Sequence, residues 1–159
     1  MADANASFTV DELITYFAAI RDQDLDALRE CLEVNPALVE SRADGHALLL
    51  RGEPFAAAVG APLGEHSATG IYFAVNSFLE YRPDAPKRTV DVVRILLEYG
   101  ADPNAIGYNG NTGHCAPIVI ASWEGGLEKM RLLLDAGADV AGDQGVAALD
   151  SAAGHNNVD

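Results

Sequence analysis

The side chains that could take part in chemistry are histidines, carboxylates and aromatic residues from the middle of the chain. A histidine transfers a proton only if a carboxylate or a substrate oxygen lies within hydrogen-bond reach. The candidate acids and bases are His46, His66, Tyr72, His114 and Glu124. A shaped pocket with one such group could promote a cyclisation, a dehydration or an isomerisation of an apolar metabolite.

The sequence predicts neither a metal ion nor a cofactor. The four histidines and two cysteines have no C-x-x-C or H-x-x-x-H spacing, which local zinc sites use. Gly107, Gly110 and Gly113 recur at every third residue. A phosphate-binding loop would need a strand before these glycines and a lysine after them. We therefore interpret them as turn residues.

A phrase that occurs twice predicts the elements that must position these side chains. The segments VDVVRILLEYGADPNA (90–105) and LEKMRLLLDAGADVAG (127–142) each place apolar residues on one face of a helix. Each helix is expected to end at a glycine, Gly100 or Gly137, 37 residues apart, because glycine adopts positive φ without strain. One such unit cannot bury its apolar face alone, so the units are expected to stack.

Partner helices are predicted before each phrase and at both ends of the chain. Residues 69–75, 116–122 and 147–153 are short apolar segments that each contain alanine, whose small side chain allows helices to approach closely. Near the N-terminus, Thr9 and Glu12 form a capping box ahead of a further helical pattern.

These segments resemble the ankyrin repeat family, whose first helices open with a pattern like T-P-L-H-x-A-A. The resemblance implies an all-α solenoid of about 3.5 helix-turn-helix units in a single domain, residues 1–159. The approximate units are 9–43, 44–105, 106–142 and 143–159. It also implies that the chain recognises another protein through its hairpin tips and first helices.

Two insertions interrupt the second unit, at residues 46–67 and 78–88. The first is unusually apolar for a surface loop, so it either packs onto the repeats or leaves an exposed patch that binds something. Folded over the concave face, it would close the groove into a pocket. Pro83 and Pro86 exclude a continuous helix through the second insertion.

Two functions from different classes therefore remain. The first is a non-catalytic protein-interaction module, with a binding surface expected at Tyr72, Asn76, His114, Trp123 and Glu124. The alternative is an enzyme that uses the candidate acids and bases on an apolar metabolite beneath residues 46–67. Tyr72 is also typical of a core aromatic residue, and His66 beside Glu65 of a solvated pair.

Charge and composition limit the classes of partner that the chain could bind. The 24 acidic and 10 basic residues give a net charge of −14, which repels nucleic acid and favours a basic protein partner. We expect no membrane span and no signal peptide, and hence a cytoplasmic protein. The fourth unit has room for only one helix, so we expect a homo-oligomer that shares Leu149 and Val158.

Overall fold

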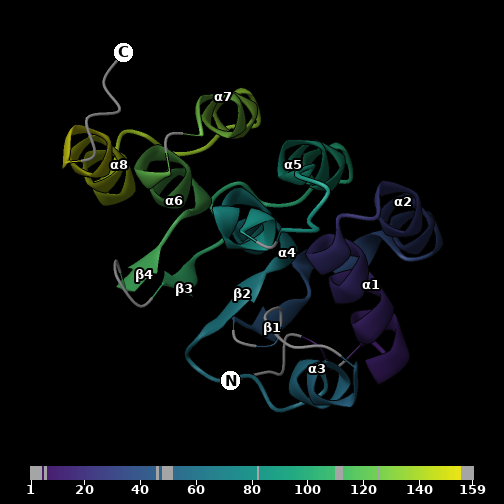
Figure 1. Ribbon diagram of the computed structural model, residues 1–159. Helices are drawn as coiled ribbons and strands as arrows, with labels where there is room; N and C mark the ends of the chain where they lie inside the picture. The colour runs from purple at the N-terminus through teal and green to yellow at the C-terminus, as the bar shows by residue number, and fades with distance from the viewer. Residues whose placement is uncertain are drawn as a thin grey trace.

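The computed structural model is mostly helical, with two small antiparallel sheets (Figure 1). It describes residues 5, 7–45, 47, 52–81, 83–109, 113–124 and 126–154. The α-helices are α1 (Val10–Asp22), α2 (Leu25–Val34), α3 (Gly52–Val59), α4 (Gly70–Val75), α5 (Thr89–Glu98), α6 (Pro117–Trp123), α7 (Leu127–Asp135) and α8 (Asp143–Gly154). The strands are β1 (Arg42–Asp44), β2 (Ser67–Thr69), β3 (Gly107–Asn109) and β4 (Gly113–Cys115), and the 3-10 helices are η1 (Pro36–Glu40) and η3 (Ser77–Glu80).

The helices pack in two rows, which we call the inner row and the outer row. In the inner row α1 contacts α4, α4 contacts α6 and α6 contacts α8, whereas in the outer row α2 contacts α5 and α5 contacts α7 (Figure 1). Consecutive helices α1 and α2, α4 and α5, and α6 and α7 also contact each other. Each helix of the two rows is thereby packed against at least one neighbour, and every described residue of α4 is buried.

The two sequence phrases adopt the same local structure. Gly100 and Gly137 have φ of 87° and 94°, and each follows the last turn of its helix, α5 or α7. Asn104, from the first phrase, accepts a hydrogen bond from the Asp139 N–H at 2.7 Å and donates one to the Gly137 carbonyl at 3.2 Å. The turn after α5 therefore holds the turn after α7 in place.

Each sheet has two antiparallel strands and lies on the inner-row side of the molecule (Figure 1). We call each a hairpin, although residues 45–66, which include α3, separate the strands of the first. In the first hairpin Arg42 of β1 is opposite Thr69 of β2, and in the second Tyr108 of β3 is opposite His114 of β4. Strands β2 and β3 also contact each other, so the two hairpins lie side by side.

The first insertion contains α3, which packs against α1 and β1 (Figure 1). Phe55 and Val59 are buried there, and the Arg21 guanidinium lies 4.1 Å from the centre of the Phe55 ring. The described part of the insertion therefore covers the N-terminal end of the inner row. His46 lies outside the described residues.

The second insertion begins with η3 and is held by Gln23, a buried residue with φ of 55° between α1 and α2. The Gln23 amide donates to the Leu79 carbonyl at 3.1 Å, and its oxygen accepts from the Arg88 N–H. The Glu80 carboxylate then accepts from the N–H of Thr89, the first residue of α5, at 3.1 Å. No described α-helix runs through this segment, as Pro83 and Pro86 predict.

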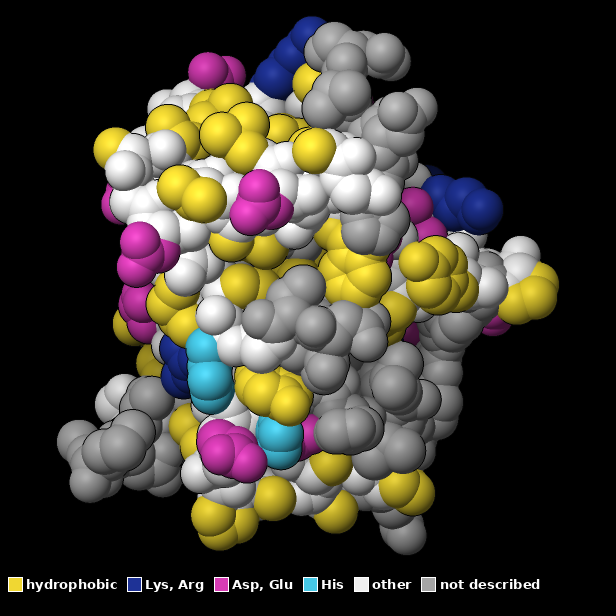
Figure 2. All heavy atoms as spheres, turned by 90° about the vertical axis from the view of Figure 1, so that its left-hand side faces the viewer, with side chains coloured by type: hydrophobic (Ala, Val, Ile, Leu, Met, Phe, Trp, Pro, Cys, Tyr) yellow, Lys and Arg dark blue, Asp and Glu magenta, His cyan; other side chains and the backbone are white. Residues whose placement is uncertain are grey.

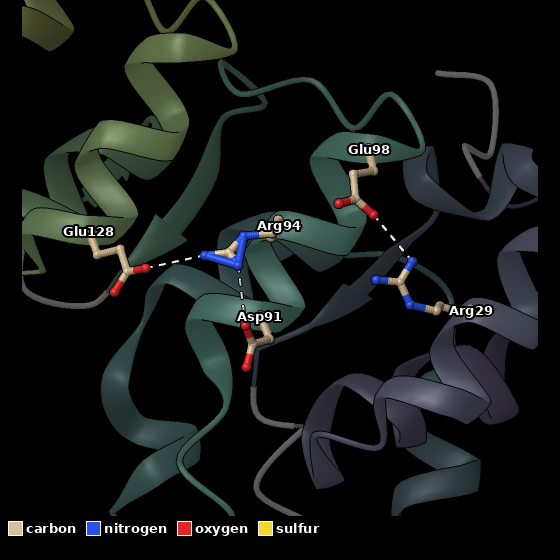
Figure 3. A network of polar contacts seen from close by, with 5 residues as sticks. All are labelled: Arg29, Asp91, Arg94, Glu98 and Glu128. Atoms are coloured by element: carbon tan, nitrogen blue, oxygen red, sulfur yellow. Dashed lines mark hydrogen bonds and ion pairs between the residues drawn. The ribbon is translucent and has the colours of Figure 1, made fainter.

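Ion pairs join the outer helices across their exposed faces (Figure 3). Arg29 of α2 lies 3.2 Å from Glu98 of α5, and Arg94 of α5 lies 3.2 Å from Glu128 of α7. Exposed pairs of this kind contribute about 0–1 kcal/mol each, so the buried apolar contacts carry most of the stability.

At the C-terminal end, α8 begins at Asp143, before the predicted start at residue 147. Leu149, predicted to be shared between subunits, is 72% exposed, and Val158 lies outside the described residues. The homo-oligomer stays a prediction. Among the described helices, none is both long enough and apolar enough to cross a membrane.

The capping box at the start of α1 predicts a pH-dependent contribution to stability. The Glu12 carboxylate accepts from the Thr9 N–H at 2.8 Å and from the Asn35 amide at 3.0 Å, and these bonds lower its pKa from the ordinary 4.5. A lowered pKa stabilises the fold above the ordinary value, and that contribution is lost as the pH falls through the folded-state pKa.

We therefore expect Glu12→Gln to lower the free energy of unfolding more at about pH 7 than at about pH 3, because the stabilisation that the lowered pKa provides is progressively lost as the pH falls below the ordinary value of 4.5. Urea unfolding at the two pH values measures the difference. Glu33→Gln removes an exposed carboxylate from α2 and is the control. An equal effect of Glu12→Gln at both pH values would contradict this prediction.

Candidate functional site

Three rings from the two hairpins form a cluster that we call the ring cluster: His66, Tyr108 and His114. The centre of the Tyr108 ring lies 4.2 Å from that of His66 and 5.3 Å from that of His114, in edge-to-face geometry. None of the three side chains is buried, and His114 is the most exposed. Histidine side chains reach the surface of this face beside hydrophobic and acidic side chains (Figure 2).

Pairing within the hairpins explains why these rings meet. Tyr108 and His114 are opposite each other in the ladder of β3 and β4, so their side chains project from the same face of the hairpin. His66 directly precedes β2, which lies beside β3. Glu65 Oε1 lies 3.5 Å from His66 Nε2 and adds a carboxylate to the edge of the cluster.

Arg42 fixes one hairpin to the other. Its Nη2 donates to the Ser67 carbonyl at 2.9 Å, at the start of β2, and to the Ile106 carbonyl at 2.6 Å, just before β3. Asn5 in turn exchanges two hydrogen bonds with the Arg42 backbone, at 2.7 and 2.9 Å. The two hairpins are therefore held in one arrangement, with the rings between them.

Tyr72 lies beneath the second hairpin and is only 2% exposed. Its hydroxyl lies 3.4 Å from Cys115 Sγ. Burial, and secondarily the contact with Cys115, raise the pKa of the hydroxyl above its ordinary value, so it stays protonated at neutral pH. Tyr72 supports the ring cluster from the core and presents almost no surface to a partner.

The remaining predicted residues lie at the other ends of the inner helices. Asn76 Oδ1 accepts from the Phe78 N–H at 3.1 Å, and Glu124 Oε2 accepts from the Ser77 N–H at 3.1 Å. These bonds satisfy the first N–H groups of η3. Trp123, the last residue of α6, is half-buried beside Glu124 in the chain.

A buried lysine also lies at this end of the inner helices. Lys129 is 6% exposed, and its Nζ donates to the Val75 carbonyl, at the end of α4, at 3.2 Å. Burial lowers the pKa of Lys129, whereas the nearby carboxylates Glu80 and Glu124 raise it. Glu124 therefore has two structural roles, as a cap for η3 and as a countercharge for Lys129.

The structure thus separates the predicted residues into two groups. His66 and His114 lie at the hairpins, whereas Asn76, Trp123 and Glu124 lie at the opposite ends of α4 and α6, about 10 Å of helix away. A general acid or base has to lie within about 3 Å of the proton that it moves. The described candidates therefore do not converge on one point, and the enzyme hypothesis, which also involves His46, stays a prediction.

The described residues that line the hollow beside the first insertion include no acid or base. The hollow has a volume of about 280 Å³ and is lined by Asn5, Phe8, Val10, Leu13 and residues 59–63. Among the described residues, no three histidine, cysteine or acidic side chains are arranged to hold a metal ion.

Sequence reasoning missed Tyr108, Arg42 and Lys129. Tyr108 could have been noticed as an aromatic residue among the turn glycines of a hairpin, a position where no core requires it. Arg42 and Lys129 carry no such signal, because their partners are backbone carbonyls that only the fold brings near.

Comparison of the chain with models of known protein families and with curated protein sequences gives no match.

The support under the ring cluster can be tested at Gly107. A Cβ atom there would lie 2.6 Å from the Tyr72 ring and 2.7 Å from Ala68 Cβ, closer than packed atoms tolerate. We expect Gly107→Ala to lower the free energy of unfolding by about 1–3 kcal/mol, the usual cost of overpacking a core.

Urea unfolding measures the change, and Gly64→Ala is the matched control because a Cβ at Gly64 meets nothing within 4 Å. The control is expected to change stability by no more than about 0.5 kcal/mol. Equal effects of the two substitutions would show that the hairpin does not rest on Tyr72.

Proposed function

We propose that this chain is an ankyrin-type repeat protein, and that its function is to bind another protein without catalysis. Three features support the fold assignment: consecutive helices that contact each other in pairs, hairpins between the pairs, and helix ends with positive-φ glycines at Gly100 and Gly137. Neighbouring pairs also contact each other in chain order, as stacked repeats do.

The observation that carries the proposed function is the ring cluster at the hairpins. Aromatic side chains offer a large contact area at low cost in conformational entropy, which is why they are frequent at the centres of interfaces. Tyr108 is held between two imidazole rings on a hairpin that Arg42 anchors. It is therefore ordered before a partner arrives, which lowers the entropic cost of binding.

The chemistry around the cluster favours a basic partner. Glu65 lies at the edge of the cluster, and the net charge of −14 attracts basic surfaces over a longer range. A lysine or arginine side chain can also lie against the face of a tyrosine ring. We therefore expect the partner to present a basic side chain to Tyr108 and Glu65.

This proposal predicts that Tyr108 is needed for binding and that another exposed tyrosine is not. Tagged chains are incubated with extract of the native cells, and the bound proteins are quantified by mass spectrometry. We expect Tyr108→Ala to reduce recovery of the specific partner about tenfold or more, as the loss of a central aromatic contact does.

Tyr81 is 74% exposed in the second insertion, so Tyr81→Ala is the matched control and is expected to retain the partner. The cost of Tyr108→Ala to folding is expected to be about 1 kcal/mol, since the side chain is not buried and its ring makes edge-to-face contacts with two imidazoles. If no protein is recovered whose binding depends on Tyr108, the proposed function is wrong.

A further inference from the structure

A second surface, distinct from the ring cluster, is a groove between α1 and α2. The groove has a volume of about 390 Å³ and is open to solvent. It extends from the capping box at Thr9 to Leu38 of η1. We call it the N-terminal groove.

The floor of the groove is apolar. Ala27, Cys31 and Val34 follow one another on the exposed side of α2, and Leu38 lies buried behind them. Val34 is 80% exposed, the highest fraction among the large exposed hydrophobic residues of the described chain. Covering an exposed apolar side chain with a partner lowers the free energy, so Val34 favours association.

The rim of the groove is acidic. Asp11, Glu12 and Glu30 line it, and none of the described lining residues is a lysine, an arginine or a histidine. Arg29, the one basic residue of α2, is paired with Glu98 on the side that faces α5 (Figure 3). Within the described part of the groove, no basic side chain neutralises the negative charge of the rim.

Part of the rim is already fixed in position. The Glu12 carboxylate is held by the Thr9 backbone and hydroxyl, both at 2.8 Å, and by the Asn35 amide. These bonds also lower the pKa of Glu12, so its negative charge persists below neutral pH. A partner that binds here does not have to immobilise this side chain.

We propose that the N-terminal groove binds a basic amphipathic segment of another protein. An apolar side chain of that segment lies against Cys31 and Val34, and its lysine or arginine side chains lie against Asp11, Glu12 and Glu30. An apolar floor with a rim of one charge selects such a segment through burial and charge complementarity.

Charge decides against a second copy of this chain as the occupant. The other end of the stack also exposes apolar residues, Val146 and Leu149 on α8, which a head-to-tail dimer would place in the groove. Acidic residues accompany them on the same helix, Asp143 and Asp150. Carboxylates would then face carboxylates across the interface, which disfavours it.

The first test uses a synthetic lysine–leucine peptide with leucine at helical spacing, and a control peptide in which serine replaces leucine. Cys31 is partly exposed in the groove, whereas Cys115 is buried, so iodoacetamide labelling of Cys31 reports occupancy directly. We expect the leucine peptide to slow this labelling about tenfold at saturation, and the serine peptide to bind about tenfold more weakly.

The second test compares matched variants by fluorescence anisotropy of the labelled leucine peptide. Val34→Lys alters the groove, and Val146→Lys makes the same change at an exposed valine of α8. Glu30→Lys and Asp150→Lys form a second pair with equal changes in net charge. We expect the groove variants to weaken binding about tenfold and the α8 variants to leave it within about twofold.

The proposal is overturned if the leucine peptide does not bind, if it leaves Cys31 labelling unchanged, or if the serine peptide binds equally well. Equal effects of Val34→Lys and Val146→Lys would mean that only the overall charge attracts the peptide. Self-association of the parent chain that Val34→Lys abolishes would make a second copy the occupant instead. Tyr108→Ala is expected to leave peptide binding unchanged, so this groove and the ring cluster are tested separately.

Discussion

The close approach of the β3 backbone to the Tyr72 ring is the contact on which the candidate site depends. Only a residue without a side chain fits at Gly107, where the hairpin lies on the inner helix α4. The same constraint recurs at Gly70, where a Cβ would lie 2.4 Å from the Tyr16 hydroxyl of α1. Packing in the core thus sets how closely the inner helices and the hairpins approach one another. This approach in turn determines where the rings of the ring cluster lie.

The sequence best predicts those features that depend on residues close together in the chain. Gly100 and Gly137 end their helices with positive φ, and the Thr9–Glu12 capping box starts α1, because the partners of these residues lie within a few positions in the chain. The pairing of the helices is also predictable, because the apolar faces of the two phrases must be buried against another helix. Two small sheets accompany these helices, so the fold is mostly rather than wholly helical.

The site is less predictable, because its contacts join residues far apart in the chain. Tyr108 meets His66 only because β2 lies beside β3, and the apolar pattern of the chain does not specify that neighbour. The position of α3 is equally non-local, since an apolar insertion could pack on any uncovered face. Phe55 instead lies under the guanidinium of Arg21, on α1.

The pairing of Asp44 with Ser67 in the first hairpin has a consequence for how this chain can vary. The segment that contains α3 leaves and re-enters the body at two adjacent points, so its length does not alter the path of the helices on either side. The entropic cost of a longer loop grows only slowly with its length. A segment of another length can therefore be accommodated at this junction without moving the flanking helices α2 and α4, provided that it still covers the face of α1 against which α3 packs.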